Sequence, residues 1–537
     1  MDTKALRQKI LDLAIRGKLV PQDPNDEPAS VLLERIRAEK QQMVKDGRLK
    51  AKDIKNDTVI FLGDDNLHYE KFADGTVKCI EDEIPFELPE GWEWTRINNI
   101  AFFQGGYAYK SNRYVAFSNN LIIRIGNVKN KTLLIDVAPV FIDDQYAEET
   151  ANYKLQECDI LFTMTGTKGK RDYFYSCIIE KSDIIKKSLF LNQRVGCLRI
   201  IEPDTVNPYL FLSFIQSTFV LDSIFSTETG NVNQGNIGST ATLNLLIPIP
   251  PIEEQKRVIN CISTVNKFID TIESDKTDLQ TTIQLTKSKI LDLAIRGKLV
   301  PQDPNDEPAS VLLERIRAEK EELIKQGKIK RDKKESVIFK GDDNSYYLKM
   351  GNVTETLDDW SIEDIPDSWC VCCLGEVCDY GNCTNVDTKD IPETAWILDL
   401  EDIEKGTGKV LQKLTLKERN SASTKHLFHK GQVLYSKLRP YLNKVVLADD
   451  DGFCTSEILP LDFNGYILPE YAKCYMMSPT FLRYANHCSY GVKMPRLGTL
   501  DGKKAVLTVP PINEQKRIAD KVSQLFSLLD SIAEKAN

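Results

Sequence analysis

The chain has 537 residues, 42% of them hydrophobic, and a formal net charge of −9. No apolar run approaches the ~18 residues of a membrane helix, and the N-terminus lacks an apolar signal core, so neither membrane insertion nor secretion is indicated. Thirteen cysteines without a paired framework fit a reducing cytoplasm. The acidic balance counts against a free-standing nucleic-acid binder, unless cations gather locally or a partner supplies them.

The first feature along the chain is an identical repeat. Residues 9–40 read KILDLAIRGKLVPQDPNDEPASVLLERIRAEK, and residues 289–320 carry the same string. Such a repeat predicts two copies of one structural plan that present the same surface. Either both copies grip the same surface on two copies of one partner, or a recent duplication or recombination has equalised them. A weaker pair, residues 59–66 and 337–344, supports the same division.

Each copy of the repeat is followed by a polar, Lys-rich arm, residues 41–57 and 321–336. We interpret the arms as solvated extensions or partner-contacting segments. Direct phosphate contact is the alternative.

The stretch from residue 92 to 249 opens with Trp92, and segments such as 121–125 and 160–163 predict β-strands. A turn with three cations follows the second of these segments. Cations and backbone amides on a turn suit phosphate oxygens, aromatic rings suit sugar or base faces, and Asn or Gln can pair with adenine. A solvated surface loop is the alternative. The candidate DNA contacts are Lys168, Lys170, Arg171, Tyr173, Gln193, Arg194 and Gln234.

A long helix is predicted from residue 253 to 296, about 65 Å in length. It follows the motif PPIEEQKR at residues 250–257, and Gly297 and Pro301 end it. Its stripe positions alternate three and four residues apart, which is coiled-coil spacing, and only Lys276 and Thr286 among them are polar. The apolar residues of the stripe are Ile262, Val265, Ile269, Ile272, Leu279, Ile283, Ile290 and Leu293.

The second variable stretch, from Trp369 to residue 509, carries similar chemistry. Its candidate DNA contacts are Lys437, Arg439, Tyr441, Asn443, Lys444, Lys493 and Arg496. It also holds a cysteine cluster, Cys370, Cys372, Cys373, Cys378 and Cys383, with His426 and His429 as possible further zinc ligands. The cysteine spacing is not that of a standard zinc knuckle, so buried structural cysteines are the favoured interpretation.

The motif PPIEEQKR recurs as PPINEQKR at residues 510–517, and the chain ends before another copy of the first repeat. That copy stands at the N-terminus instead, which predicts a circularly permuted pair of repeats with neighbouring chain ends. The helical segments at the two ends are too short to be stable alone. We therefore expect them to pack antiparallel on the intact helix. The alternative is that each helix packs only on its own globular domain.

Catalytic motifs are missing from the sequence. We find no methyl-donor loop joined to an Asn-Pro-Pro-Tyr motif, and Asn207-Pro208-Tyr209 has the pattern of a helix start. The segment 166–170 is too short for a Walker A loop. We therefore expect a non-catalytic chain.

These motifs, together with LYSKLRPYLNK at residues 434–444 and LNQRV at 191–195, resemble the specificity subunit of type I restriction-modification enzymes. The resemblance covers essentially the whole chain. It implies two target-recognition domains, each reading one half of an asymmetric bipartite DNA site, and a cytoplasmic protein. The variable stretches diverge too widely in this family for base-contacting residues to be transferred.

The resemblance also implies the partners. Two adenine methyltransferase (modification) subunits dock on the repeated regions, and restriction (motor and nuclease) subunits join them. S-adenosylmethionine, ATP and Mg are expected in those partner subunits, with no cofactor or metal in this chain. The candidate partner contacts are Arg16, Lys18, Arg296, Lys298, Glu254, Gln255, Glu514 and Gln515.

The expected fold class is α+β, with two mixed α/β recognition domains separated by a pair of long antiparallel coiled-coil helices, pseudo-twofold and circularly permuted. The predicted segments are 1–91, 92–249, 250–368, 369–509 and 510–537. A helix of fixed length would fix the gap between the half-sites, so inserting one turn after Thr271 should shift that gap. Two alternatives remain, a structural adaptor that does not touch DNA and a nucleic-acid enzyme with an unfamiliar active site.

Overall fold

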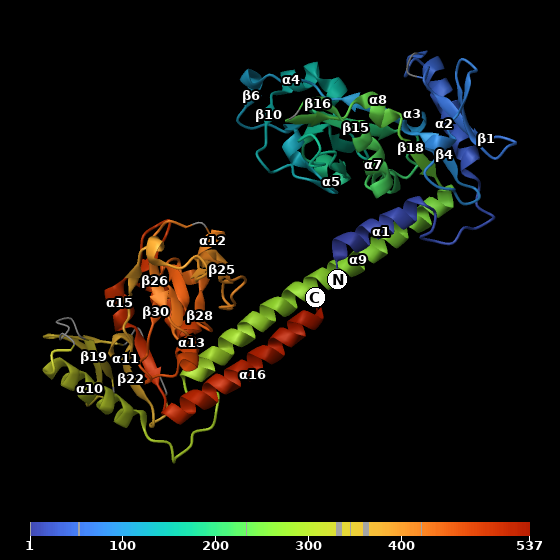
Figure 1. Ribbon diagram of the computed structural model, residues 1–537. Coiled ribbons are helices and arrows are strands. Elements are labelled where there is room, and N and C mark those ends of the chain that lie inside the picture. Colours follow the sequence, from blue (N-terminus) through green and yellow to red (C-terminus); the bar gives the residue numbers. More distant parts are fainter. Residues whose placement is uncertain are drawn as a thin grey trace. The chain divides into compact units, whose positions relative to one another are not determined.

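The computed structural model describes residues 2–51, 54–231, 233–328, 336–343, 345–357, 365–419 and 421–536. Contacts divide the chain into two compact units, unit 1 (Met1–Ser274) and unit 2 (Asp275–Asn537). Helix α9 (Ile252–Ile295) crosses this boundary, so its first half belongs to unit 1 and its second half to unit 2. Each unit contains a helix pair, a small three-stranded sheet and a mixed α/β domain (Figure 1).

In unit 1, α1 (Thr3–Ile15) lies beside the first half of α9 (Figure 1). Arg7 of α1 donates a hydrogen bond to Asp270 at 2.7 Å. Gln22, beyond the end of α1, donates one to Glu254 at 3.1 Å, near the start of α9. Residue numbers therefore rise along one helix as they fall along the other. The predicted antiparallel packing is confirmed in this unit.

In unit 2, α16 (Ile512–Ala536) lies beside the second half of α9. The ammonium of Lys287 on α9 is 2.5 Å from Asp530 on α16. Gln302, beyond the end of α9, donates to Glu514 near the start of α16 at 2.5 Å. The packing is again antiparallel. The expected closeness of the two chain ends involves one end in each unit and stays a prediction.

Helix α9 packs on α1 and α16 and also contributes side chains to the cores of both domains. Val258 and Ile262 belong to the core of the first domain, and Ile290 and Leu291 belong to the core of the second. The alternative, in which each helix packs only on its own globular domain, was therefore wrong, although α9 does contribute to both domain cores. Ile272 is 43% exposed, so the predicted buried stripe is interrupted there. The interruption lies where Arg7 binds the neighbouring residues Asp270 and Glu273, because polar contacts replace apolar packing at that level.

Both copies of the repeat turn in the same way after their helix. Gly17 and Gly297 have φ of +64° and +66°. A Cβ on either glycine would lie 2.4 or 2.5 Å from a ring carbon of Pro89 or Pro366. Only glycine fits such a turn. A loop then leads to α2 (Ala29–Lys45) in unit 1 and to α10 (Ala309–Lys325) in unit 2.

A three-stranded antiparallel sheet follows each of these helices. The strands are β1 (Thr58–Leu62), β2 (His68–Phe72) and β3 (Val77–Cys79) in unit 1, and β19 (Ser336–Lys340), β20 (Tyr346–Met350) and β21 (Val353–Thr356) in unit 2.

The end of the first arm is not a plain solvated extension. Lys40 is 1% exposed. Its ammonium lies 2.6 Å from the carboxylate of Asp57, at the end of the first arm, and donates a hydrogen bond to the Asn98 carbonyl at 3.0 Å. The end of this arm is thus anchored on the domain, contrary to the interpretation as a solvated extension, while partner contact by the arms stays a prediction. Residues 52–53 of the first arm and 329–335 of the second lie outside the described residues.

The first recognition domain combines two four-stranded sheets, in the orders β13-β11-β15-β5 and β14-β7-β10-β6, with smaller sheets. Its strands are β4 (Glu93–Arg96), β5 (Ala101–Gly105), β6 (Tyr114–Val115), β7 (Asn120–Ile123), β8 (Val128–Lys129), β9 (Thr132–Leu133), β10 (Phe141–Ile142), β11 (Ile160–Thr163), β12 (Thr165–Gly166), β13 (Ser176–Ile178), β14 (Ser188–Leu191), β15 (Val195–Ile200), β16 (Thr229–Asn231), β17 (Gln234–Asn236) and β18 (Leu246–Ile249). Its helices are α3 (Ile97–Ile100), α4 (Asp144–Glu149), α5 (Lys181–Ile184), α6 (Pro208–Ile215), α7 (Thr218–Ser226) and α8 (Ser239–Leu243).

The second recognition domain has a five-stranded sheet, β23-β26-β29-β24-β25, and a three-stranded sheet, β28-β27-β30. Its strands are β22 (Cys370–Cys373), β23 (Asn385–Val386), β24 (Trp396–Leu398), β25 (Leu414–Thr415), β26 (Lys425–Phe428), β27 (Val433–Ser436), β28 (Val445–Leu447), β29 (Gly452–Thr455), β30 (Ile458–Leu461), β31 (Ser489–Tyr490), β32 (Arg496–Leu497) and β33 (Val506–Val509). Its helices are α11 (Leu374–Val377), α12 (Leu416–Arg419), α13 (Pro469–Met477), α14 (Pro479–His487) and α15 (Thr499–Lys504).

Both domains end with the same order of elements: two helices, a hairpin, a short helix and a strand. This last strand pairs with the first strand of the domain, β18 with β4 and β33 with β22, and so closes the domain at the start of α9 or α16. Within the described residues, no single helix is long and apolar enough to cross a membrane, and α6 and α7 meet that criterion only together, as a pair bent by 62°.

Candidate nucleic-acid interface

A tryptophan, a glutamate and a glutamine join each recognition domain to its helix pair. In unit 1 the indole Nε1 of Trp92 donates to the carboxylate of Glu254 at 3.0 Å, and the amide of Gln22 donates to the same carboxylate. Arg257, one turn along α9, is 2.6 Å from Asp26 in the loop after α1. We call this set of contacts the joint. Its counterparts in unit 2 are Trp369, Glu514, Gln302, Arg517 and Asp306.

A second glutamine in each joint holds the domain backbone. The side chain of Gln255 accepts a hydrogen bond from the Asn207 amide at 2.8 Å and donates to the Pro250 carbonyl at 3.0 Å. Gln515 makes the same two bonds, to the backbone of Leu468 and Pro510.

The structure corrects four of the predicted partner contacts. Glu254, Gln255, Glu514 and Gln515 are each at most 1% exposed, and they bind their own unit. They are therefore joint residues, and the assignment to a partner surface was wrong for them. Burial raises the pKa of Glu254 and of Glu514 above the ordinary value. The repeated Trp and the repeated Glu-Gln pair were visible in the sequence, but no local pattern indicated that they meet.

The other four predicted partner contacts lie at the surface of the repeat. Lys18 and Lys298 are exposed, and Arg16 and Arg296 are half-buried. The guanidinium of Arg16 stacks 4.5 Å from the ring centre of Phe86, while that of Arg296 donates to Asp292 within α9 at 2.8 Å. These four positions remain predicted partner contacts.

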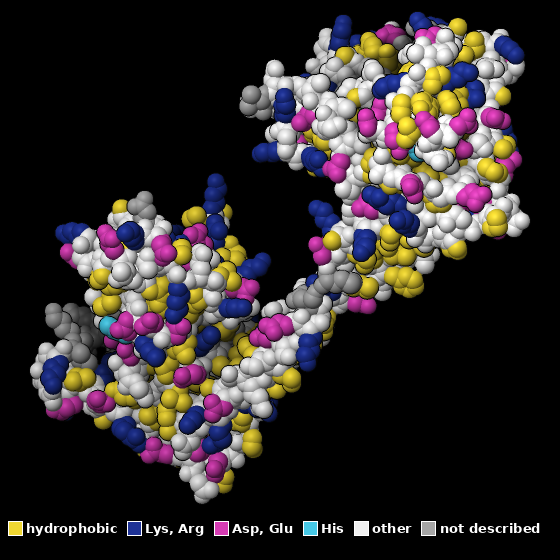
Figure 2. Space-filling view, turned by 45° about the vertical axis from the view of Figure 1, so that its right-hand side comes forward, with side chains coloured by type: hydrophobic (Ala, Val, Ile, Leu, Met, Phe, Trp, Pro, Cys, Tyr) yellow, Lys and Arg dark blue, Asp and Glu magenta, His cyan; other side chains and the backbone are white. Residues whose placement is uncertain are grey.

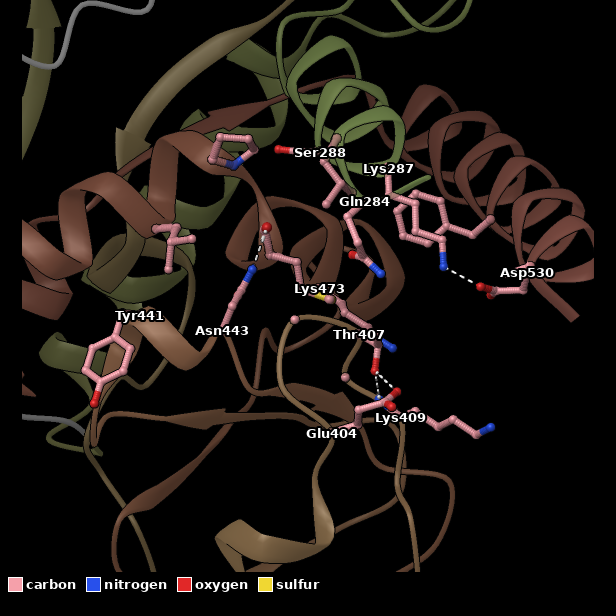
Figure 3. Close-up of a pocket in the computed structure, with 18 of the residues that line it drawn as sticks. Gln284, Lys287, Ser288, Glu404, Thr407, Lys409, Tyr441, Asn443, Lys473 and Asp530 are labelled. Carbon is pink, nitrogen blue, oxygen red and sulfur yellow. Dashed lines mark hydrogen bonds and ion pairs between the residues drawn. The ribbon is translucent and has the colours of Figure 1, made fainter. Parts of the chain in front are cut away.

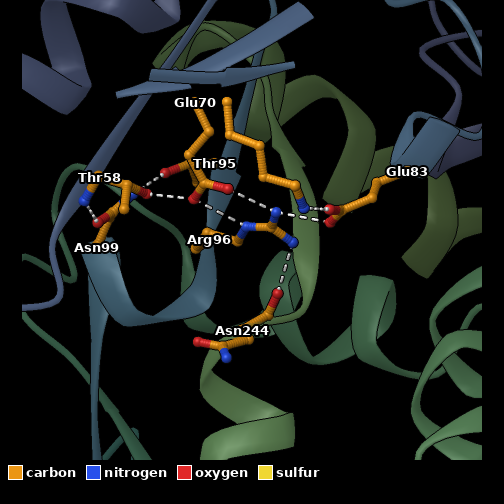
Figure 4. A network of polar contacts seen from close by, with 8 residues as sticks. Thr58, Glu70, Glu83, Thr95, Arg96, Asn99 and Asn244 are labelled. Atoms are coloured by element: carbon orange, nitrogen blue, oxygen red, sulfur yellow. Dashed lines mark hydrogen bonds and ion pairs between the residues drawn. The ribbon is translucent and has the colours of Figure 1, made fainter. Parts of the chain in front are cut away.

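A buried ion pair ties the small sheet of unit 1 to its recognition domain (Figure 4). Glu70 of β2 is 4% exposed and receives two hydrogen bonds from the guanidinium of Arg96 on β4, at 3.1 and 2.8 Å. The same guanidinium donates to Glu83 at 2.7 Å and to the Asn244 carbonyl at 2.9 Å. Thr58 of β1 donates to Glu70 at 2.7 Å and completes the network.

The corresponding positions of unit 2 are apolar. Aligning Trp92 with Trp369 places Cys373 at the position of Arg96, and aligning the small sheets places Leu348 at the position of Glu70. Both residues are buried in one cluster with Ile338 and Val506. The small sheet thus contacts its recognition domain through an ion pair in unit 1 and through a hydrophobic cluster in unit 2. This is expected, because well-packed apolar residues can replace a buried ion pair.

This alignment also explains the cysteine cluster. Cys372, Cys373 and Cys378 are buried core residues, and burial raises the pKa of each thiol. Cys370 and Cys383 are partly buried against the same core. In the described part of the chain no three His, Cys, Asp or Glu side chains are arranged to hold a metal ion.

The first basic turn, after β11, presents Lys168, Lys170 and Arg171 to solvent. The ammonium of Lys168 donates to the Gly230 carbonyl in the hairpin β16–β17 at 2.9 Å. Tyr173 is 3% exposed, and its hydroxyl donates to Glu228 at 2.6 Å. The prediction that Tyr173 contacts DNA was therefore wrong, because the ring belongs to the domain core.

Three further candidates of this domain are exposed polar side chains. Gln193 and Arg194 form the tight turn between β14 and β15, where Arg194 has φ of +71°. A Cβ on Gly106 would lie 2.0 Å from the Asn192 carbonyl oxygen, so the backbone packs closely at this turn. Gln234 begins β17 in the hairpin next to the basic turn.

The second basic turn, after β27, lies against the hairpin β31–β32. The backbone amide of Arg439 donates to the Pro495 carbonyl at 2.7 Å, and that of Leu497 donates to the Lys437 carbonyl at 3.0 Å. The side chains of Lys437 and Arg439 are half-buried at the domain surface.

The two residues that end this turn are directed into the domain. The ammonium of Lys444 donates to the Leu400 carbonyl at 2.6 Å, and the amide of Asn443 donates to the Met477 carbonyl at 3.0 Å. Each side chain thus uses one donor within the domain and is half-buried, and the assignment of both as DNA contacts stays a prediction.

A cavity of about 810 Å³ with a mixed polar and apolar lining lies beside this end of the turn in unit 2 (Figure 3). Asn443 and the 53% exposed Tyr441 line it, together with side chains of α9, α13 and α16. Lys473 also lines the cavity, and burial lowers the pKa of its ammonium. The lining combines lysines with Glu404, Asp530 and Glu534, so it is not a phosphate-binding surface.

Lys493 and Arg496 complete the candidates. Lys493 is exposed near the tip of the hairpin β31–β32. Arg496 is held at the base of the hairpin, where its guanidinium is 2.8 Å from Glu457.

The two basic turns occupy equivalent places in unlike domains. Each follows the central strand of a sheet, β11 or β27, and each pairs with the hairpin between the same helices of the shared order. Cations and acidic side chains are interspersed over the face seen in Figure 2, without one continuous basic field. The structure therefore brings together, in each domain, one basic turn and one hairpin tip.

Comparison with known proteins identifies the family. A family model described as the type I restriction modification DNA specificity domain matches residues 89–281 and again residues 366–537. The specificity subunit of the type I restriction enzyme EcoAI of Escherichia coli is 31% identical over 380 residues, which are 62% of this chain and 58% of that protein. The EcoEI specificity subunit of Escherichia coli is 31% identical over 376 residues, 62% of this chain and 57% of that protein. The chain thus spans less than two thirds of the length of these relatives.

A solved structure from a study of complex assembly and conformational transition of the type I R-M system supports the fold. It matches with a TM-score of 0.51 and 14% sequence identity, over 84% of this chain and 94% of that chain. The double match of the family model covers both recognition domains, α9 up to residue 281 and all of α16. The chain belongs to the family of type I restriction modification DNA specificity domains.

Proposed function

We propose that this chain is the DNA-specificity subunit of a type I restriction-modification complex and recognises an asymmetric bipartite site. Each recognition domain reads one half-site through its basic turn and hairpin. The observation that carries the proposal is the contrast between identical joints and unlike domains. Two recognition domains with different surfaces, each attached through the same joint contacts, are suited to recognising two different DNA sequences in the same manner.

The chain itself is proposed to be non-catalytic and to act in the cytoplasm. Two methyltransferase subunits dock on the two copies of the repeat, where Lys18 and Lys298 are exposed in equivalent positions. Two identical surfaces on one chain call for two copies of the same partner. Restriction subunits complete the complex, and S-adenosylmethionine, ATP and Mg act in the partner subunits.

The proposal is tested by mapping methylated adenines in cells that contain the chain and its methyltransferase subunit. We expect a single bipartite motif with unequal halves and a fixed spacer. Methylation that requires the chain but lacks any shared motif would instead support the structural adaptor, which does not touch DNA.

A binding assay with the mapped duplex then tests the first basic turn. Replacing Lys168 and Lys170 by Ala should weaken binding to all duplexes alike and reduce the slope of affinity against salt concentration by about one for each phosphate group that is no longer bound. Lys71→Ala, an exposed cation of the small sheet outside the recognition domains, is the matched control. An unchanged slope in the double variant would remove the turn from the interface.

A further inference from the structure

The hairpin of the second recognition domain ends in an unusually exposed apolar tip. Strands β31 and β32 are joined by residues 491–495, and Tyr490, Val492 and Met494 are 62%, 102% and 50% exposed. Gly491 has φ of +101°, and a Cβ there would lie 3.2 Å from the Met494 carbonyl oxygen, so the tip is narrow. Clustered apolar side chains of this kind on a surface mark a binding site.

The base of this hairpin is firmly held. Leu497 is 1% exposed, Arg496 is paired with Glu457, and the Ser489 hydroxyl donates to the Ala485 carbonyl at 2.6 Å. The Pro495 carbonyl accepts a hydrogen bond from the basic turn. The tip therefore projects from a rigid support.

The charge around the tip indicates a polyanionic partner. From residue 471 to 500 the sequence contains no Asp or Glu, although the chain as a whole has 79 of them and a net charge of −9. The same stretch carries Lys493 at the tip and Arg483 and Arg496 nearby. Lys437 and Arg439 of the basic turn lie against the hairpin base. Arg496 is neutralised by Glu457, so the positive charge at this hairpin comes from Lys493 at the tip and from Lys437 and Arg439 of the basic turn. An apolar tip beside these cations suits a nucleic-acid duplex better than a protein surface.

The tip of the equivalent hairpin in the first recognition domain reads NVNQ at residues 231–234, so amide side chains outnumber the single valine, Val232, which lies outside the described residues. Its described residues are Asn231, Asn233 and Gln234, all exposed and neutral, and Lys168 supports it from the basic turn. Amide side chains read base edges through hydrogen bonds. Apolar side chains can either contact a thymine methyl group or enter between stacked bases. The three apolar side chains of this narrow tip present more apolar surface than a single thymine methyl group can cover.

We propose that the tip formed by Tyr490, Val492 and Met494 is a wedge that enters a base step of the half-site read by the second domain, whereas the first domain reads its half-site through hydrogen bonds. The inference rests on the proposed function and adds the mode of recognition. Part of the sequence preference of the second domain then comes from how easily a step unstacks, which favours a pyrimidine–purine step.

The test uses the chain assembled with its methyltransferase subunits and duplexes of the mapped target. 2-Aminopurine replaces one purine at a time, except at the methylated adenines and the purines next to them, because methyltransferases flip their target base out of the stack. We expect fluorescence to rise on binding at one step of the second half-site and at no position of the first. The double variant Val492→Ser with Met494→Ser should lose the rise and bind about tenfold more weakly. Val353→Ser, an exposed valine of β21, is the matched control and should change neither quantity.

Two results would overturn the wedge. One is sequence-specific binding by the unaltered chain without a fluorescence rise at any position. The other is a rise that persists in the double variant. Weaker binding when uracil replaces thymine, with no rise, would assign the tip to a methyl contact instead. Failure of the proposed function looks different, because the complex would then show no preference for the mapped duplex over a random one.

Discussion

At the scale of single residues, the joint shows how a repeated motif can have an internal role. The buried carboxylates of Glu254 and Glu514 accept hydrogen bonds from an indole and an amide that lie far away in the sequence. Removing such an acceptor leaves buried donors without a partner, which costs more than the bond contributes.

The first prediction concerns this joint. Glu254→Leu should lower the free energy of unfolding by about 2–3 kcal/mol, because the Nε1 of Trp92 loses its acceptor in a buried site. Glu514→Leu should have a similar effect through Trp369. Urea denaturation followed by tryptophan fluorescence measures both variants. Glu253→Ala, next to the joint but exposed, is the control and should change the stability by less than about 0.5 kcal/mol. Equal effects of Glu254→Leu and the control would contradict the internal role.

The second prediction is a pH dependence in the second recognition domain. His426 is 7% exposed, its Nδ1 is 2.8 Å from the Ile458 carbonyl, and burial lowers its pKa. The unfolded chain takes up the proton more readily than the folded domain. The contribution of this group to stability is therefore present above an unfolded pKa of about 6.5 and is lost as the pH falls below it.

We expect His426→Asn, which keeps a donor for the Ile458 carbonyl, to reduce the loss of thermal stability between about pH 7.5 and about pH 5. His429→Asn is the control, because the His429 side chain is 60% exposed. The account of His426 is wrong if both variants keep the full pH dependence.

At the scale of elements, the helix ends are set by local chemistry and the turns by tertiary contacts. The third prediction uses this difference. Gly17→Ala should destabilise unit 1 by about 2–3 kcal/mol, since a left-handed φ is combined with a clash against Pro89. Gly47→Ala has a similar φ of +71° but no atom within 4 Å, so it should cost only about 1 kcal/mol. Thermal unfolding compares the two, and equal losses would show that the close approach of Pro89 is unimportant.

Much of the element order could be predicted from the sequence. The long helix was expected at 253–296 and spans Ile252–Ile295, and the strand expected at 160–163 is β11. Periodicity and capping are local signals, which is why these predictions were accurate. Asn207 caps α6 as its sequence indicated.

The site could be predicted only in part. Basic turns were visible as clusters of charge, but burial of Tyr173 and the inward direction of Asn443 and Lys444 depend on contacts with distant segments. The two hairpin tips were missed as elements for the same reason. Their signal in the sequence was the acid-free stretch around Val492, which is meaningful only beside the basic turn.

At the scale of the whole molecule, α9 belongs to both units. The fourth prediction is that its length sets the spacer between the half-sites. Insertion after Thr271 would disturb the contacts of Arg7 with Asp270 and Glu273, so we move the inserted turn to follow Thr277. Methylation mapping should then show both half-sites unchanged and a different spacer. An unchanged spacer would contradict the idea that the helix is a ruler.

The central claim is that each recognition domain reads its own half-site from an equivalent joint. The identical repeat offers a clean junction for the test, since residues 41–249 can replace residues 321–509. The exchanged segment carries Arg96 together with its partner Glu70, so the contact between the small sheet and the domain is preserved.

The most direct measurement is therefore the methylation motif produced by this exchanged chain with its methyltransferase subunits. We predict a symmetric site in which the half-site of the first domain occurs twice, in opposite orientations, and the half-site of the second domain is absent. A motif that keeps the second half-site, although the domain proposed to read it has been removed, would contradict the account.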